Sequence, residues 1–98
     1  MKARLIFDRR VAISETAFVE LVLWEVPKPV LGSQHRFKFR LALVVKGNCI
    51  LRYDNEAGKG GHSHSSDGER PYIFISVDQL LADFSQDVER WRNENTDA

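Results

Sequence analysis

Two histidines lie two residues apart near the middle of the chain, in the stretch RYDNEAGKGGHSH of residues 52–64. An extended backbone places residues i and i+2 on the same side, so the imidazoles of His62 and His64 are predicted to lie together. Histidine is the side chain that most readily exchanges a proton near neutral pH. The spacing therefore indicates a site for proton transfer or for a metal ion.

The residues before these histidines can complete a ribonuclease site. Cleavage of RNA without a metal needs one group that takes the proton of the ribose 2′-hydroxyl, one that protonates the leaving oxygen, and fixed positive charge on the phosphate. His62 and His64, or one of them with Glu56, can move the protons. Lys59 and Arg52 can supply the charge. The other catalytic candidates, which we expect to hold the loop or orient an imidazole, are Tyr53, Asp54 and Asn55.

The same two histidines also allow a metal site. A zinc ion would need further ligands, and the nearby supply is Asp54, Glu56, Asp67 or His35. The chain has no second ligand pair at a recognisable spacing, so we predict no metal and no cofactor, and a metal-dependent hydrolase stays an alternative. The GKGG turn lacks the spacing and the following Ser or Thr of a phosphate-binding P-loop.

Basic residues alternate with apolar ones just before this stretch. In RFKFRLALVV, Arg36, Lys38 and Arg40 fall on one side of a predicted strand and the aromatic rings on the other. No acid occurs between Glu25 and Asp54. Together with Arg52, this predicts a basic outer face that can follow an RNA backbone.

The apolar periodicity predicts the elements that position these residues. Strands are expected at about 3–13, 17–26, 36–46, 49–54 and 72–75, with a long glycine- and histidine-containing loop over 55–71. Ser76 followed by Gln79 fits a capping box, and apolar residues recur at helical spacing over 77–93. The fold class is therefore α+β, a single domain whose antiparallel sheet of about five strands carries one C-terminal helix on one face.

Composition limits the class of protein. The 98 residues are enough for one modest core, and the formal net charge is zero. No apolar run is long enough to span a bilayer, so we expect a cytoplasmic protein. Cys49 is the single cysteine, which excludes an internal disulfide, and we expect it to be a small buried hydrophobe.

Three segments resemble the TumE family of bacterial toxin–antitoxin proteins. They are AFVELVLWEVPKPVLGSQHRFKFRLALV, LRYDNEAGKGGHSH and PYIFISVDQLLADFSQDV, and the likeness runs from about residue 3 to 91. The resemblance implies a toxin that binds a helix-turn-helix antitoxin. The motif residues it carries over are Trp24, His35, Arg40, Tyr53, Asp54, Asn55, Glu56, Gly58, Lys59, Gly60, His62 and His64.

RNA cleavage follows from the residues themselves and not from the family name. We expect a toxin that acts as a metal-independent endoribonuclease, with Lys59, Arg40 and Arg52 on the phosphate. One alternative is a binding protein that inhibits its target by occupancy. Trp24 and the N-terminal strands offer an edge for the antitoxin or for a second copy of the chain, and we expect a homodimer.

Overall fold

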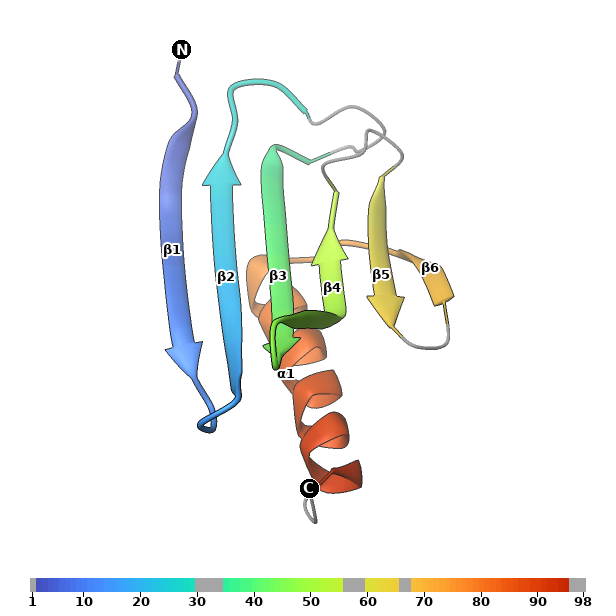
Figure 1. The fold of residues 1–98 in the computed structure, drawn as a ribbon. Coiled ribbons are helices and arrows are strands. Elements are labelled where there is room, and N and C mark those ends of the chain that lie inside the picture. Colours follow the sequence, from blue (N-terminus) through green and yellow to red (C-terminus); the bar gives the residue numbers. More distant parts are fainter. Residues whose placement is uncertain (1, 30–34, 56–59, 66–67, 96–98) are drawn as a thin grey trace.

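The computed structural model describes residues 2–29, 35–55, 60–65 and 68–95. These residues form six strands and one helix, which follow one another in the order shown in Figure 1. The elements are β1 (Arg4–Ala12), β2 (Ala17–Glu25), β3 (Phe37–Val45), β4 (Asn48–Asp54), β5 (Gly61–Ser65), β6 (Gly68–Tyr72) and α1 (Val77–Glu94).

The six strands make one antiparallel sheet in which each strand pairs with the next along the chain. Helix α1 packs against one face, and in Figure 1 it lies behind the sheet. The predicted α+β class with one C-terminal helix is confirmed. The prediction of about five strands was one too low, because the chain turns back once more after β5.

The hydrophobic core lies between α1 and the middle of the sheet. Alternate residues of β2, β3 and β4 point toward the helix, as the period of two in a strand requires. The helix contributes Leu80, Phe84 and Val88, which recur every four residues and so share one face. The strand residues of this core are Val19, Leu23, Phe39, Leu41, Leu43, Leu51 and Tyr53.

Helix α1 begins where its cap predicts. The Ser76 Oγ accepts the backbone N–H of Gln79 at 3.0 Å, and Asp78 in the first turn complements the positive end of the helix dipole. The cap therefore fixes the residue at which the helix begins.

The other face of the sheet carries no helix in the described ranges, and we call it the helix-free face. Directly opposite residues of antiparallel strands point to the same side, so the strand register defines which side chains it carries. Its polar members are Asp8, Arg10, Glu20, Lys38, Arg40, Arg52, Asp54, His62, His64 and Glu69.

The predicted loop over 55–71 was wrong for residues 61–65 and 68–71, which belong to strands. Residues 61–65 and 68–72 form the β5–β6 hairpin, in which Ser65 lies opposite Gly68. Gly68 has a φ of 110°, which a turn residue without a Cβ adopts at low cost. The predicted strand at 72–75 was also wrong, because β6 ends at Tyr72 and Ile73 is 80% exposed.

The strands predicted at about 36–46 and 49–54 are present and form the β3–β4 hairpin, but one residue of this hairpin faces an unexpected side. Lys46 and Gly47 both have positive φ, as in the two-residue turns that join antiparallel strands. A register shift follows, so that Cys49 lies opposite Val44 while Leu51 lies opposite Leu43. This bulge turns Cys49 toward the helix-free face, and the expectation that it is buried was wrong.

Candidate functional site

The two histidines lie on the helix-free face, on strand β5. The register places His64 opposite Arg52 of β4 and opposite Glu69 of β6, and it places His62 opposite Asp54. Because opposite residues share a face, these five side chains form one row across three strands. We call this row the histidine row.

Glu69 connects the two imidazoles. Its Oε1 lies 2.7 Å from His62 Nδ1 and 3.9 Å from His64 Nε2, and the ring centroids are 6.3 Å apart. The short contact to His62 does not have the angle of a hydrogen bond, and both ring nitrogens of His62 are buried without such a bond in the described ranges. The side chain of His64 is 30% exposed and that of Glu69 is 50% exposed. An incoming ligand therefore meets Glu69 and His64 rather than the nitrogens of His62.

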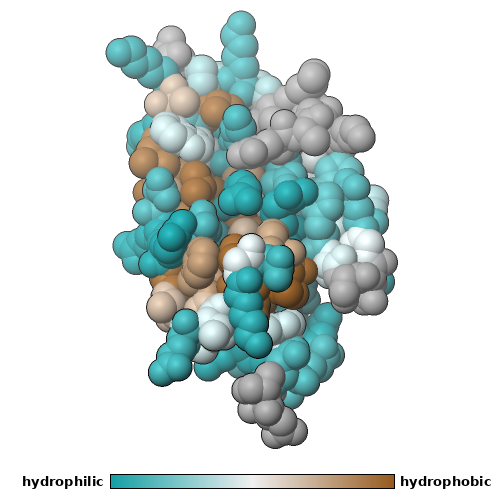
Figure 2. Space-filling model, in the orientation of Figure 1, coloured by the Kyte–Doolittle hydropathy of each residue, from teal (hydrophilic) through white to brown (hydrophobic). Residues whose placement is uncertain are grey.

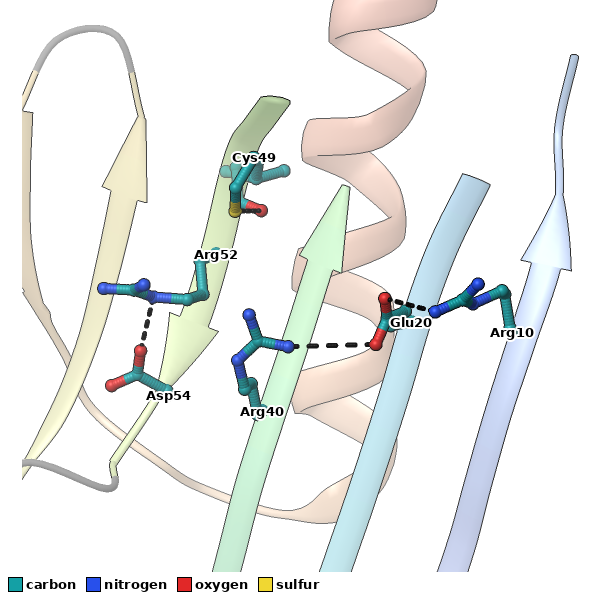
Figure 3. A network of polar contacts seen from close by, with 7 residues as sticks. Arg10, Glu20, Arg40, Cys49, Arg52 and Asp54 are labelled. Atoms are coloured by element: carbon teal, nitrogen blue, oxygen red, sulfur yellow. Dashed lines mark hydrogen bonds and ion pairs between the residues drawn. The ribbon is translucent and has the colours of Figure 1, made fainter. Parts of the chain in front are cut away.

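The histidine row includes one fixed cation, the guanidinium of Arg52. Arg52 Nε is 2.6 Å from Asp54 Oδ2, and Asp54 is nearly buried whereas Arg52 is 37% exposed. Figure 3 shows Asp54 at the Nε side and the two terminal nitrogens of the guanidinium directed toward β5. Those nitrogens can donate to an anion placed next to His64.

A second group of charges continues across the middle of the helix-free face. Glu20 lies between Arg10 and Arg40, at 3.1 Å from an Arg10 terminal nitrogen and 3.9 Å from an Arg40 one (Figure 3). Arg10 also lies over the Phe18 ring at 4.5 Å. Arg40 therefore already has one acidic partner.

Lys38 differs from these arginines because it forms no ion pair within the described residues. It is exposed and lies opposite Trp24 on the helix-free face. Figure 2 shows this face with hydrophobic residues gathered mainly over β1 and β2 and near the β3–β4 turn, whereas the part over β4 to β6 is mostly hydrophilic. Lys38 stands between the two regions.

Tyr53, a predicted catalytic residue, points to the opposite face. Its hydroxyl donates to the Asp87 carboxylate of α1, and the Tyr72 hydroxyl donates to Asp83 at 2.5 Å. Burial, followed by these hydrogen bonds to carboxylates, raises the pKa of both tyrosines well above the usual range. The two hydroxyls therefore stay protonated and tie the sheet to the helix, away from the histidine row.

Asn55 has a structural position at the end of β4. Its side chain is fully buried, its Oδ1 accepts the Phe39 N–H at 3.0 Å, and its Nδ2 donates to the Phe37 carbonyl at 2.7 Å. Both partners belong to β3. The amide thus extends the β3–β4 pairing by one residue and fixes where the chain leaves the sheet.

Comparison with known protein families identifies the family of this chain. A family model described as Toxin TumE matches residues 2–92. The chain belongs to the TumE toxin family. No curated protein matches the chain, and no solved structure does.

Membership assigns this TumE chain a toxin role, and a toxin of this kind implies an antitoxin as its partner. In the part of the chain that the structure describes, no helix is long and apolar enough to cross a membrane.

The structure does not assign several predicted residues of this TumE chain to the histidine row. Glu56, Gly58 and Lys59 lie outside the described residues. His35 packs on the Phe74 ring, with centroids 4.1 Å apart, next to the start of β3. Within the described ranges, no three His, Cys, Asp or Glu side chains are arranged to hold a metal ion.

Two acidic residues of the helix-free face were not predicted. Glu69 contacts both histidines, and Glu20 contacts two arginines. The available signal for Glu69 was the Asp67–Gly68 dipeptide, which is typical of a two-residue hairpin turn. A two-residue turn at those positions would pair Ser65 with Arg70, whereas the structure pairs Ser65 with Gly68, so this signal indicates a hairpin but not the observed pairing of Glu69 with His64. Glu20 had no comparable signal, because its neighbours come from strands far along the chain.

Proposed function

We propose that this TumE toxin is an endoribonuclease that cleaves RNA on its helix-free face without a metal ion. The single observation that supports the proposal best is the contact of Glu69 with His62 and His64, beside the partly exposed guanidinium of Arg52. A carboxylate, an imidazole and a guanidinium are a sufficient set for cleavage through the ribose 2′-hydroxyl.

The exposure of each group supports a division of roles. Glu69 is the general base that removes the proton from the 2′-hydroxyl, and the attacking oxygen then forms a bond to phosphorus. His64 is the general acid that gives a proton to the departing 5′-oxygen. His62 has buried ring nitrogens, so it acts through Glu69 as a positioning residue that holds the carboxylate.

Positive charge on the phosphate comes from β3 and β4. Arg52 is nearest, because it lies opposite His64. Further positive charge comes from β3 and the residue before it, namely Arg36, Lys38 and Arg40. These side chains hold the RNA backbone on either side of the cleaved bond. Lys59, the further predicted phosphate contact, and Glu56, the alternative predicted acid, lie outside the described residues. Asp54 was expected to hold the loop or orient an imidazole, and here it orients Arg52 by the contact to its Nε.

The test is cleavage of a structured RNA by purified protein, together with growth arrest on expression in bacteria. His64→Ala and Glu69→Gln are each expected to lower the cleavage rate by about 100-fold or more, the usual contribution of an acid or a base. The double change His62→Ala with His64→Ala is expected to abolish growth arrest. Addition of a chelator is expected to leave cleavage unchanged.

His35→Gln is the matched control, because it removes the third histidine, which lies away from the histidine row. It is expected to retain cleavage. Full cleavage by His64→Ala would exclude this mechanism. Growth arrest that survives the double histidine change but is lost in Lys38→Glu would instead support inhibition by occupancy, and loss of cleavage with a chelator would support the metal-dependent alternative.

We further propose that the antitoxin is a helix-turn-helix protein encoded beside this toxin, and that both act in the cytoplasm, where the RNA is. Co-expression of the neighbouring gene should relieve growth arrest, and the two proteins should co-purify. A neighbouring gene that neither relieves the arrest nor binds the toxin would contradict this assignment.

A further inference from the structure

Strand β1 is an open edge of the sheet. Among the described strands it pairs with β2 alone, and Figure 1 shows it at the outer limit of the sheet. Leu5, Ile6 and Val11 are each more than 40% exposed. An edge of nine residues with apolar side chains presents unpaired backbone groups that readily accept a further strand.

The opposite edge does not share this property. Strand β6 has five residues and includes Pro71, which has no N–H to donate to a neighbouring strand. The two edges of one sheet therefore differ in length and in hydrogen-bonding capacity. A strand from another chain would therefore add to the sheet at β1 and not at β6.

We propose that two copies of this chain pair through their β1 strands, antiparallel and about a two-fold axis, into one continuous sheet. Two neighbouring antiparallel strands can be related only by an axis perpendicular to the sheet. Such an axis keeps each face on its own side, so residues that meet across it come from the same face. Both copies of α1 then lie on one side and both histidine rows on the other.

The charges on β1 select the register. With Arg9 at the axis, Asp8 lies opposite Arg10 of the second copy on the helix-free face. Phe7 lies opposite Val11 of the second copy on the helix side. Each of these pairs occurs twice, and Asp8 has no ion pair within its own chain among the described residues. Opposite charges at facing positions stabilise paired strands.

The neighbouring register is disfavoured. With Asp8 at the axis, the two Asp8 carboxylates face each other, and Phe7 faces Arg9 of the second copy. The chosen register places the two Arg9 side chains opposite each other instead. Their long apolar stems allow the guanidinium groups to diverge into solvent.

The first test uses charge reversal and sedimentation equilibrium of the full chain. The unchanged chain is expected to have twice the mass of one chain. Asp8→Arg and Arg10→Asp each create two like-charge pairs and should weaken self-association by about tenfold or more. An equimolar mixture of the two variants has two opposite-charge pairs and should restore association. Circular dichroism of each variant checks that it is folded.

The second test fixes the register. In a Cys49→Ser background, Arg9→Cys places the two sulfur-bearing residues at facing positions, within the range of roughly 4.4–6.8 Å between Cα atoms that a disulfide requires. Val11→Cys is the matched control, since its two copies lie about four residues apart along the strand. Rapid cross-linking of Arg9→Cys alone is expected.

Three outcomes would overturn the proposal. One is a monomer at all concentrations, including the case in which β1 instead takes a strand of the antitoxin. Another is failure of the mixed variants to associate while the unchanged chain is a dimer. The third is faster cross-linking through Val11→Cys than through Arg9→Cys.

Discussion

The side chain of Asn55 makes the backbone hydrogen bonds to β3 that one more residue of β4 would make. It accepts from Phe39 and donates to Phe37, so two backbone groups of β3 are satisfied beyond the end of the neighbouring strand. A buried amide that makes such bonds is costly to remove, because its partners are left without hydrogen bonds.

Asn55→Ala is expected to lower the free energy of unfolding by about 2–4 kcal/mol, since two buried backbone groups lose their partners. Urea denaturation monitored by circular dichroism measures this change. Asn48→Ala is the matched control at the exposed start of β4 and should change stability by less than about 0.5 kcal/mol. Equal losses for both variants would contradict the structural role of Asn55.

His35 gives the fold a dependence on pH. Its Nδ1 accepts the Phe37 N–H at 3.1 Å, and burial lowers the pKa of the imidazole. Below about pH 6.5 the unfolded chain therefore binds a proton that the folded chain does not. The corresponding stability is complete above that pH and decreases as the pH falls.

The expected result is a loss of stability between about pH 7.5 and about pH 5.5 that is larger in the unchanged protein than in His35→Gln. Urea denaturation at the two pH values gives the comparison. The substitution removes only this titration and leaves His62 and His64 in place. An identical pH dependence in both proteins would show that His35 does not contribute.

At the scale of residues, the sequence allowed the common direction of His62 and His64 to be predicted, because alternation along one strand is local. It did not allow the contact with Glu69 to be predicted, because that contact depends on the register of a hairpin that was assigned as loop. The polar pattern of YDN also gave no sign that Asn55 is fully buried and Tyr53 faces the helix.

At the scale of elements, the β5–β6 hairpin determines whether the histidine row exists. Gly61 is essential to its packing, because a Cβ at this position would overlap the carbonyl oxygen of Tyr72 on the neighbouring strand. The backbone of β6 would have to move away. His62 is the next residue along β5, so its contact with Glu69 would be disturbed as well.

Gly61→Ala is expected to destabilise the hairpin by about 1–3 kcal/mol, the usual cost of inserting an atom into a filled space. Hydrogen exchange of the β5 and β6 amides should become faster, while exchange in β2 and β3 stays slow. Gly47→Ala is the control: the positive φ of Gly47 favours glycine, but the added atom meets nothing within 4 Å, so exchange in β5 and β6 should stay as it is. Unchanged exchange in β5 and β6 would contradict the assigned contact.

The elements that were predicted well have strong apolar periodicity, namely the four long strands and α1. Strands β5 and β6 are short and rich in Gly, Ser and His, so propensity carried little information. The bulge near Cys49 illustrates a second limit. One extra residue in a strand reverses the side to which its neighbours point, and no local pattern marks it.

At the scale of the whole molecule, the two faces of the sheet have different roles. The side that packs on α1 supplies stability, and the helix-free side presents charge. The formal net charge is zero, so attraction of the proposed RNA substrate depends on this distribution and not on the total. Lys38 is the clearest probe because no acid within the described residues is paired with it.

Lys38→Glu is expected to weaken RNA binding and to reduce the slope of log affinity against log salt by about 0.7, the value for one phosphate contact on a single strand. Fluorescence anisotropy with a labelled RNA at several salt concentrations measures both effects. Lys46→Glu makes the same charge change beyond the far end of β3 and should have a smaller effect. Equal effects of the two changes would indicate general attraction without a defined RNA path.

The proline near the end of β6 has a consequence for assembly. A sheet that can grow at both edges can add copies without limit, and the product is a fibre. In this chain Pro71 and the short strand around it prevent growth at one end. Association through β1 therefore closes at two copies, so even high expression of the toxin should give small, soluble particles and no polymer.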